Sequence, residues 1–506
     1  MLMVKRKSRI DILLKYTGLG TLTVLCIILA AAVLSCGGNP GKQEQPNILL
    51  ITVDTLRADY LSVYGYKGHK TRNLDEFAQE GAVFDSAYCD VNWTTPSMAS
   101  TLTGVYAYKH QLRSMYQKLP DAADTTAEHL KAAGYHTAAV IGAFPLDSIY
   151  NLDQGFDVYN DTFTGAIYSG PKPPAEIQSR WGDTVKERRQ LFFKKIFNKS
   201  RRTDNEVTEA AIQILDGFSK KKGPFFLWVH YFGPHALPDV RRNRVENWNV
   251  HAKRYPEKVL NSDKAVGDLL SALDSYNFDN TLVIFHADHG ESLWEHGFVG
   301  HGVYLYEDNL RIPLIMRWPG QIPRGRRVSQ LVGNVDIAAT ILDAAKIHGK
   351  PVKNMDGKSL LPVIRRGEKI HQSLYFETYL CAHDMHAEIV EIEKGKKIPV
   401  GIRSYGVLEK PWKYIKTEFF PLFDSPDTVI AKEIRQRVKK QELFNLEQDP
   451  GELISVGRTA KGTKISLHLG KLLTQYTAPD KNGNKKNRIK LSDENLEKLK
   501  SLGYVE

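Results

Sequence analysis

The chain has 506 residues, of which 42% are hydrophobic and 25% are charged, and its formal net charge is +11. This composition is typical of a globular protein with a sizeable core, and it excludes a largely disordered chain. Only four cysteines are present, which also excludes a fold held together by many disulfides or by a cysteine-rich zinc cluster.

The first 36 residues differ from the rest of the chain. A basic stretch, KRKSR, precedes an apolar run that ends in VLSC and two glycines. This order is typical of a secretion signal, and its ending resembles a bacterial lipobox with Cys36 as the acylated residue. An uncleaved signal anchor is the alternative, because the run is nearly long enough to span a bilayer. Both predict an exported, membrane-anchored protein, so nucleic acid is not an expected partner; residues 37–45 are a flexible tether.

Four apolar runs predict buried strands, and three of them end in polar residues: 46–54, 136–142, 225–232 and 281–290. Helical patterns lie between them at 125–134 and 262–276. Alternating strands and helices predict an α/β fold, with a mostly parallel sheet covered by helices on both faces. We assign this α/β domain to residues 46–395, with 160–205 as an insertion.

The sequence beyond residue 396 changes to short strands and turns, which predicts a small C-terminal α+β subdomain over 396–506. Two segments are locally basic, 186–202 and 481–490. The first has apolar residues at helical spacing, so we interpret it as a solvated surface helix; a membrane contact or a rim for an anionic substrate is the alternative.

Acidic residues and histidines gather at the predicted strand ends. Asp54 ends the first strand, His230 ends the third, and Asp288 and His289 follow the fourth. The carboxyl ends of parallel strands share one edge of a sheet, where ligands bind. A carboxylate next to an imidazole at such an edge is half of a site for a divalent metal.

The stretch NWTTPSMAS, starting at residue 92, changes from a loop into a helix. A hydroxyl at Thr94 would lie at the helix N-terminus, where anions are favoured, and Pro96 suits the first turn. A nearby metal would lower the pKa of this hydroxyl and make it a nucleophile. Alternatively, Thr94 or Thr95 only caps the helix.

Five segments together resemble the sulfatase family of the alkaline phosphatase superfamily, from about residue 46 to the C-terminus: PNILLITVDTLRADYLSVYGY, NWTTPSMASTLTG, HYFGPHALP, DHGESLWEHGFVGHGVYLYEDNLRIPLIMRWPG and ELFNLEQDPGEL. The resemblance implies an alkaline-phosphatase-like mixed sheet and a metal held by Asp54, Asp288 and His289. It also implies that His235 is the family's substrate-side histidine and that His301 matches another histidine of this subgroup.

Several positions depart from the family pattern. Typical sulfatases carry a Cys or Ser where Thr94 stands, which the cell converts to formylglycine, and an Arg where Met98 stands. Thr94 is not compatible with that conversion. Thr55 replaces the family's second acid, and Gly233 replaces an acid that two-metal relatives use. A direct threonine nucleophile resembles the phosphorus-handling relatives, such as nucleotide phosphodiesterases, lipoteichoic acid synthases and phosphoethanolamine transferases.

The sequence therefore predicts a metal-dependent hydrolase of phosphate or sulfate esters, with phosphoesters favoured. Thr94 attacks and also contacts the metal, while His235 and His301 stabilise charge or protonate the leaving group. The nitrogen ligand favours zinc or manganese, with calcium or magnesium possible. The substrate is an anionic ester of a small molecule, a glycan or a lipid head group. The basic side chains after the nucleophile are candidates for anion binding, with a solvated surface as the alternative: Lys109, His110 and Arg113.

Three alternative functions remain open from the sequence. A genuine sulfuric ester hydrolase would fit the family, and a transferase of phospho-head-groups would fit the cell envelope. A non-catalytic surface lipoprotein would fit the departures from the family motif, although the acids and histidine of the predicted metal site are present.

Overall fold

The computed structural model describes residues 45–163, 200–236, 244–297, 299–380, 388–392, 396–421, 441–476, 489 and 491–502. The compact unit starts at Pro46. The predicted signal and tether, the middle of the predicted insertion and nearly all of both basic segments lie outside the described residues. Within the described part of the chain, no helix combines the length and apolar character that crossing a bilayer requires.

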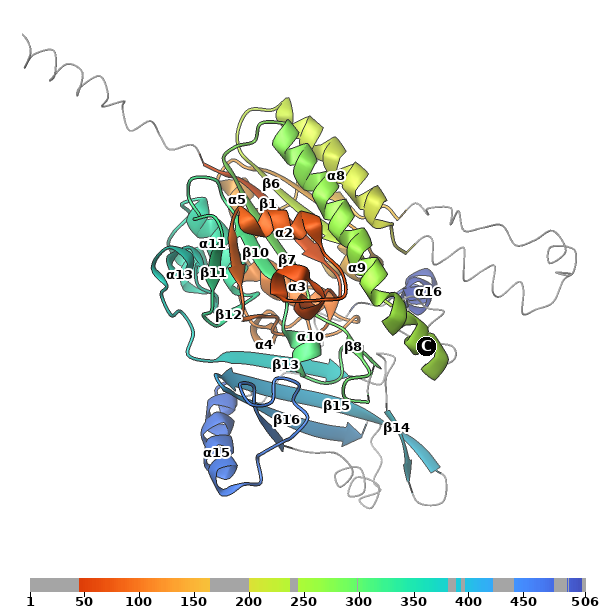
Figure 1. Cartoon of the computed structure of the whole chain (residues 1–506). Helices are drawn as coiled ribbons and strands as arrows, with labels where there is room; N and C mark the ends of the chain where they lie inside the picture. The colour runs from red at the N-terminus through yellow and green to blue at the C-terminus, as the bar shows by residue number, and fades with distance from the viewer. Residues whose placement is uncertain are drawn as a thin grey trace, which may run out of the picture. The chain divides into compact units, whose positions relative to one another are not determined.

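A mixed eight-stranded sheet forms the centre of the unit, in the order β11-β2-β10-β7-β1-β6-β4-β5 (Figure 1). Neighbouring strands are parallel except at β10, which is antiparallel to both β2 and β7. The strands are β1 (Asn47–Val53), β2 (Ala82–Phe84), β4 (His136–Ile141), β5 (Val158–Asn160), β6 (Phe225–Tyr231), β7 (Thr281–Ala287), β10 (Leu314–Arg317) and β11 (Arg326–Val328). The mostly parallel sheet is thus confirmed, and the four predicted strands are β1, β4, β6 and β7.

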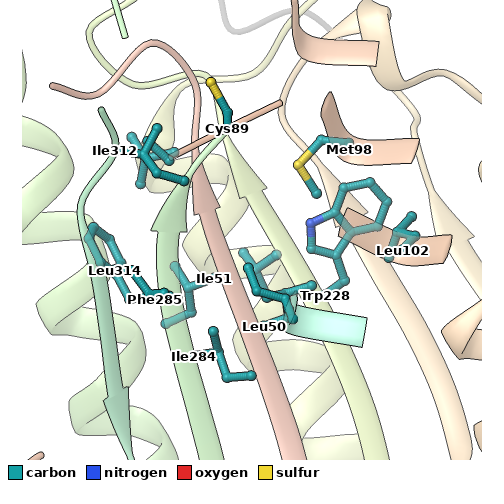
Figure 2. Packing of buried hydrophobic residues seen from close by; sticks show 14 of the residues in the cluster. Leu50, Ile51, Cys89, Met98, Leu102, Trp228, Ile284, Phe285, Ile312 and Leu314 are labelled. Atoms are coloured by element: carbon teal, nitrogen blue, oxygen red, sulfur yellow. The ribbon is translucent and has the colours of Figure 1, made fainter. Parts of the chain in front are cut away.

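The central strands are apolar along their whole length because helices cover both of their faces. On β6 the Tyr231 hydroxyl meets Thr208 of α8 (Asp204–Ser219) at 2.9 Å. Trp228, three residues earlier, points to the opposite face of the sheet, toward Met98 and Leu102 of α3 (Thr94–Thr103; Figure 2). The helices therefore lie on both sides, as predicted.

Further helices complete the two layers. The helix α9 (Arg244–Ser275) packs against α8 and α2 (Arg72–Gln79), and α11 (Asp336–Ala344) packs against α3 and α5 (Thr126–Ala132). The predicted helix at 262–276 is only the second half of α9, which continues through Pro256 and starts eighteen residues earlier, at Arg244 rather than 262.

A second, antiparallel sheet follows in the order β13-β15-β16-β17, with β14 paired to β15. Its elements are β13 (Leu374–Leu380), β14 (Glu388–Ile392), β15 (Lys396–Glu409), β16 (Trp412–Pro421) and β17 (Gln441–Asn445), with α15 (Ala460–Thr474) packed against β15 and β16. Because β13 pairs with β15 from Leu374 onward, this sheet begins before the boundary that we placed at 396.

The shorter elements connect these layers: β3 (Ala87–Tyr88), α4 (Ala107–His110), β8 (Ser292–Leu293), β9 (Val299–Gly300), α10 (Glu307–Leu310), β12 (Val332–Gly333), α12 (Lys350–Lys353), α13 (Leu361–Arg366) and α16 (Asp493–Leu502). One link reaches the second sheet directly, because Val91 forms a parallel bridge with Glu377 of β13. The loop that leads into α3 is therefore tied to the second sheet.

Candidate active site

The site lies where β1, β6 and β7 end side by side. Thr52 of β1 is in register with His230 of β6 and with His286 of β7. Asp54 lies two residues after Thr52, and Asp288 lies two residues after His286. Their side chains therefore project from the same face of the sheet. The predicted gathering of acids and histidines at this edge follows directly from the parallel register.

The two carboxylates are buried and only partly hydrogen-bonded. Asp288 Oδ1 accepts hydrogen bonds from the backbone N–H groups of Thr55 (3.0 Å) and His289 (2.7 Å). Among the described residues, its Oδ2 and both carboxylate oxygens of Asp54 have no hydrogen-bond partner. Burial, and then the charges of Asp288 and Glu291, raise the pKa of Asp54 well above its usual value. For both carboxyl groups of such a pair to be ionised, a positive charge must lie beside them.

Thr55 is held in a strained conformation beside this pair. Its φ is +56°, which is rare for a β-branched residue. The N–H of Thr55 points at Asp288, and its carbonyl accepts a hydrogen bond from the Tyr255 hydroxyl of α9 at 2.6 Å. Strain of this kind persists where surrounding contacts enforce it, and it often marks a functional site.

Imidazole nitrogens face the carboxylates. His289 donates its Nδ1–H to the carbonyl of Gly290 (2.9 Å), which leaves Nε2 as an acceptor. This Nε2 lies 3.9 Å from Asp54 Oδ1 and 3.6 Å from Asp288 Oδ2. On the other side of Asp54, His230 Nε2 lies 4.0 Å from Oδ2. Burial lowers the pKa of His230 to about 3, so the ring is neutral.

These groups fit a divalent metal. Ligand atoms of Asp54, His230 and Asp288 lie within 4.8 Å of one another, and their buried atoms without partners are the kind that a cation satisfies. The predicted ligands Asp54, Asp288 and His289 are brought together by the fold. His230 was placed at this edge from the sequence but was not predicted as a ligand, because strand position gives no interatomic distances.

Thr94 is the first residue of α3 and lies beside the carboxylates. Its hydroxyl is 3.3 Å from His289 Nε2. Trp93 occupies the cap position of the helix, and no side chain caps it. The adjacent Thr95 hydroxyl points away and donates to the carbonyl of Pro145 at 2.6 Å. The two threonines are therefore distinguished by direction, and neither is the helix cap that the alternative interpretation required.

His301 and His235 lie next to His289, with the His301 ring centroid 4.5 Å from that of His289 and 5.2 Å from that of His235. His301 donates its Nδ1–H to Glu291 Oε1 at 2.8 Å. Burial alone would raise the pKa of Glu291, but His301 and His251 hold it well below its usual value. The carboxylate of Glu291 therefore stabilises the protonated form of His301.

Sequence reasoning missed Glu291, His251 and Lys258. His251 Nε2 lies 3.6 Å from Glu291 Oε2, and Lys258 donates to the backbone carbonyl of His235 at 2.8 Å. Two of these residues come from α9, which belongs to no recognised motif. For Glu291, the signal was its place directly after DHG in the sequence.

The basic residues after the nucleophile helix are engaged elsewhere. Lys109 forms an ion pair with Asp356, and Arg113 pairs with Glu377 at 2.8 Å. His110 is buried, and burial lowers its pKa to about 3. Their contact with an anion stays a prediction, which the burial of His110 and the carboxylate partners of the two cations do not favour.

The positions that depart from the family pattern have local structural reasons. Met98 is fully buried and lies beside Trp228 in the apolar core (Figure 2). Gly233 has a φ of +54°, and a Cβ there would lie 2.5 Å from Val53 Cγ1. An acid cannot be accommodated at Gly233 without rearrangement. Cys89 is a free, buried thiol.

Known proteins are similar to this chain over most of its length. The family model described as Sulfatase matches residues 46–347. N-acetylgalactosamine-6-sulfatase of Canis lupus familiaris is 28% identical over 384 residues, covering 70% of this chain and 72% of that protein. N-acetylglucosamine-6-O-sulfatase of Bacteroides thetaiotaomicron is 25% identical over 552 residues, covering 90% of each chain.

Two solved structures share the fold. A protein solved in complex with its substrate D-glucosamine-2-N,6-O-disulfate has a TM-score of 0.62 at 20% identity, covering 88% of this chain and 100% of that chain. The phosphonate monoester hydrolase of Agrobacterium radiobacter has a TM-score of 0.59 at 19% identity, covering 85% and 95%.

Fold and site together define a hydrolase of the alkaline phosphatase superfamily. Within that superfamily, the chain belongs to the sulfatase family, whose members use a divalent metal. The resemblance inferred from the sequence is thereby confirmed. Which ester it cleaves, and through which nucleophile, is a separate question.

Proposed function

We propose that this sulfatase-family hydrolase cleaves phosphate esters through a direct attack by Thr94. One observation carries the proposal: the residue at the start of α3 has an ordinary secondary hydroxyl, which lies 3.3 Å from His289 Nε2 beside two buried carboxylates. A threonine cannot become formylglycine, so this hydroxyl is itself the available nucleophile.

The surrounding residues support proton movement in the required directions. The Thr94 hydroxyl lies beside His289 Nε2, a candidate metal-binding atom, so its proton passes to solvent and not to this ring, and the backbone N–H groups at the start of α3 favour the anionic group under attack. A divalent metal held by Asp54, Asp288 and His289 would lower the pKa of the Thr94 hydroxyl and neutralise charge on the substrate. His301, held by Glu291, can donate a proton to the leaving group.

The chemistry of the second step favours phosphorus over sulfur. Formylglycine hydrate releases sulfate by collapsing to the aldehyde, and a threonine sulfate ester has no such route. A threonine phosphate ester can be displaced in line by water, because phosphorus accepts a nucleophile while the Thr94 oxygen leaves with its electron pair and regains a proton.

The test is a substrate panel with matched variants. Nitrophenyl sulfate, phosphate monoester and phosphodiester are each offered with zinc, manganese or calcium. We expect phosphoester turnover that is lost in Thr94→Ala, by about 1,000-fold or more, and largely kept in Thr95→Val. Full activity of Thr94→Ala, or an equal loss in both variants, would overturn the nucleophile assignment.

A genuine sulfatase is the second candidate, because the relatives at 25–28% identity are named as sulfatases of amino sugars. Those names also support an anionic glycan ester as the substrate class. This candidate is favoured if the panel shows turnover of the sulfate ester only.

The cellular location remains the prediction made from the sequence. The lipobox-like segment supports an exported lipoprotein held in a membrane by lipid on Cys36. Loss of membrane association in Cys36→Ser is expected, and an unchanged membrane fraction would contradict it.

A further inference from the structure

His230 is held differently from three other histidines at the ends of β6 and β7. His235, His286 and His289 each place Nδ1 on the backbone carbonyl of the next residue, at 2.7, 2.7 and 2.9 Å. A carbonyl only accepts, so these rings carry their proton on Nδ1. His230 Nδ1 instead lies 2.8 Å from the hydroxyl of Thr52, which can either donate or accept.

The hydrogen bonds around Thr52 are compatible with a His230 ring that carries its proton on Nδ1. The indole N–H of Trp228 can only donate, and it donates to Thr52 Oγ1 at 2.9 Å. The one hydroxyl proton of Thr52 can reach the carbonyl of Val229 at 3.5 Å. The second lone pair of Oγ1 then accepts Nδ1–H of His230, which leaves Nε2 of that ring without a proton.

The other tautomer places a proton where it has no acceptor within reach. If Thr52 donated to Nδ1, His230 would direct an Nε2–H toward Asp54 Oδ2 across 4.0 Å. An N–H···O bond extends to only about 3.2 Å. A separation of 4.0 Å is too long for a hydrogen bond, but it is within the span of two ligand bonds of about 2.0–2.2 Å to one ion.

We propose that His230 is a ligand of the active-site metal and that Thr52 and Trp228 hold it in the ligating tautomer. His230 Nε2, Asp54 Oδ2 and Asp288 Oδ2 are all buried and have no hydrogen-bond partner among the described residues. The inference concerns the metal site alone, so it does not depend on whether the substrate is a phosphate or a sulfate ester.

The packing of Trp228 makes this arrangement rigid. The indole is fully buried and rises from β6 toward Met98 and Leu102 of α3 (Figure 2). Helix α3 therefore fixes the Trp228 indole, which in turn orients the hydroxyl of Thr52. A second imidazole ligand also favours zinc, manganese or another transition metal over calcium and magnesium, which prefer oxygen.

The test counts imidazole ligands directly in the full protein. Mn²⁺ is bound to the metal-free protein, and electron spin echo envelope modulation counts the coordinated imidazoles. We expect two in the parent protein, from His289 and His230, and one in His230→Gln, with Mn²⁺ bound at least 10-fold more weakly. His286→Gln is the matched control, because it removes a buried imidazole from β7, on the far side of β1 from His230; it should keep both couplings.

A second pair of variants tests the tautomer. Thr52→Val keeps the shape but removes the hydroxyl, and it should weaken Mn²⁺ binding about 10-fold to 100-fold, whereas Thr52→Ser should bind like the parent. A single imidazole in the parent would overturn the proposal. Equal losses in His230→Gln and His286→Gln, or unchanged affinity in Thr52→Val, would overturn it too. The count in the parent decides the matter even where a variant does not fold.

Discussion

Two adjacent threonines at the start of α3 differ in what their hydroxyls meet. Thr94 faces an imidazole and two carboxylates, while Thr95 donates to a backbone carbonyl. The same residue type thus has a chemical role at one position and a structural role at the next. The helix geometry causes the difference, because consecutive side chains on a helix point about 100° apart.

The role assigned to His301 can be tested through the leaving group. Because His301 is expected to donate a proton as the ester bond breaks, His301→Ala should lower turnover of an alkyl phosphoester by about 100-fold or more. A nitrophenolate leaves without a proton, so its ester should lose less than about 10-fold. Glu291→Gln should show the same pattern more weakly. Equal losses on both esters, measured as kcat/KM, would contradict the role.

His110 should contribute to acid sensitivity instead of to anion binding. The N–H of Leu112 donates to Nδ1 of His110, so Nε2 carries the proton and donates to Ser100 at 2.9 Å. Burial, with the charge of Arg113 second, lowers the pKa of His110 from 6.5 to about 3. As the pH falls through the unfolded pKa, the unfolded chain binds a proton that the folded chain refuses, so stability is lost.

The comparison variant is His110→Gln, which can keep a donor near Ser100 and does not titrate. Between about pH 7 and about pH 5, the parent should lose about 2 kcal/mol of unfolding free energy relative to this variant, at about 1.4 kcal/mol per unit below the unfolded pKa. Urea unfolding at several pH values measures the difference. Parallel curves would show that the histidine protonates in the folded state.

At the scale of elements, the sequence predicts the central strands well because they are buried on both faces. A continuous apolar run such as NILLITV predicts a buried strand, and the polar residues that follow it mark where the strand ends. The start of the second sheet was harder to place. Its first strand, LYFETYL, carries Glu377 in its middle, and that buried acid pairs with Arg113 from a loop distant in the sequence and accepts a hydrogen bond from the Tyr375 hydroxyl. Such pairings are not visible before the fold is known.

The same limit applies to the site. The acids at the ends of β1 and β7 could be predicted, because parallel strands bring their carboxyl ends together. The contributions of α9, from His251 and Lys258, could not, because the sequence does not state which part of a long helix passes the site. The strained backbone of Thr55 likewise depends on Tyr255 of that helix.

For the whole molecule, the bound metal should contribute a large part of the free energy of unfolding. Without it, Asp54 and Asp288 are two buried carboxylates with unsatisfied oxygens, and burial and mutual repulsion raise the pKa of Asp54. In chelator near neutral pH, Asp54→Asn should therefore be more stable than the parent, by about 1–3 kcal/mol.

Adding the metal should reverse the order of the two proteins. Manganese or zinc stabilises the parent by binding its folded state, and Asp54→Asn should gain little. Thermal unfolding with and without metal gives both values. If Asp54→Asn were less stable than the parent in chelator, other groups of the metal-free protein would already stabilise the Asp54 carboxylate, which would contradict the prediction.

The stereochemical course at phosphorus tests the central claim most directly. A phosphodiester made chiral with sulfur is hydrolysed in isotopically labelled water, and the configuration of the product is determined. Attack by Thr94 followed by attack of water comprises two in-line displacements, each inverting phosphorus, so the account predicts net retention. Net inversion would show that water attacks the substrate directly and that Thr94 is not the nucleophile.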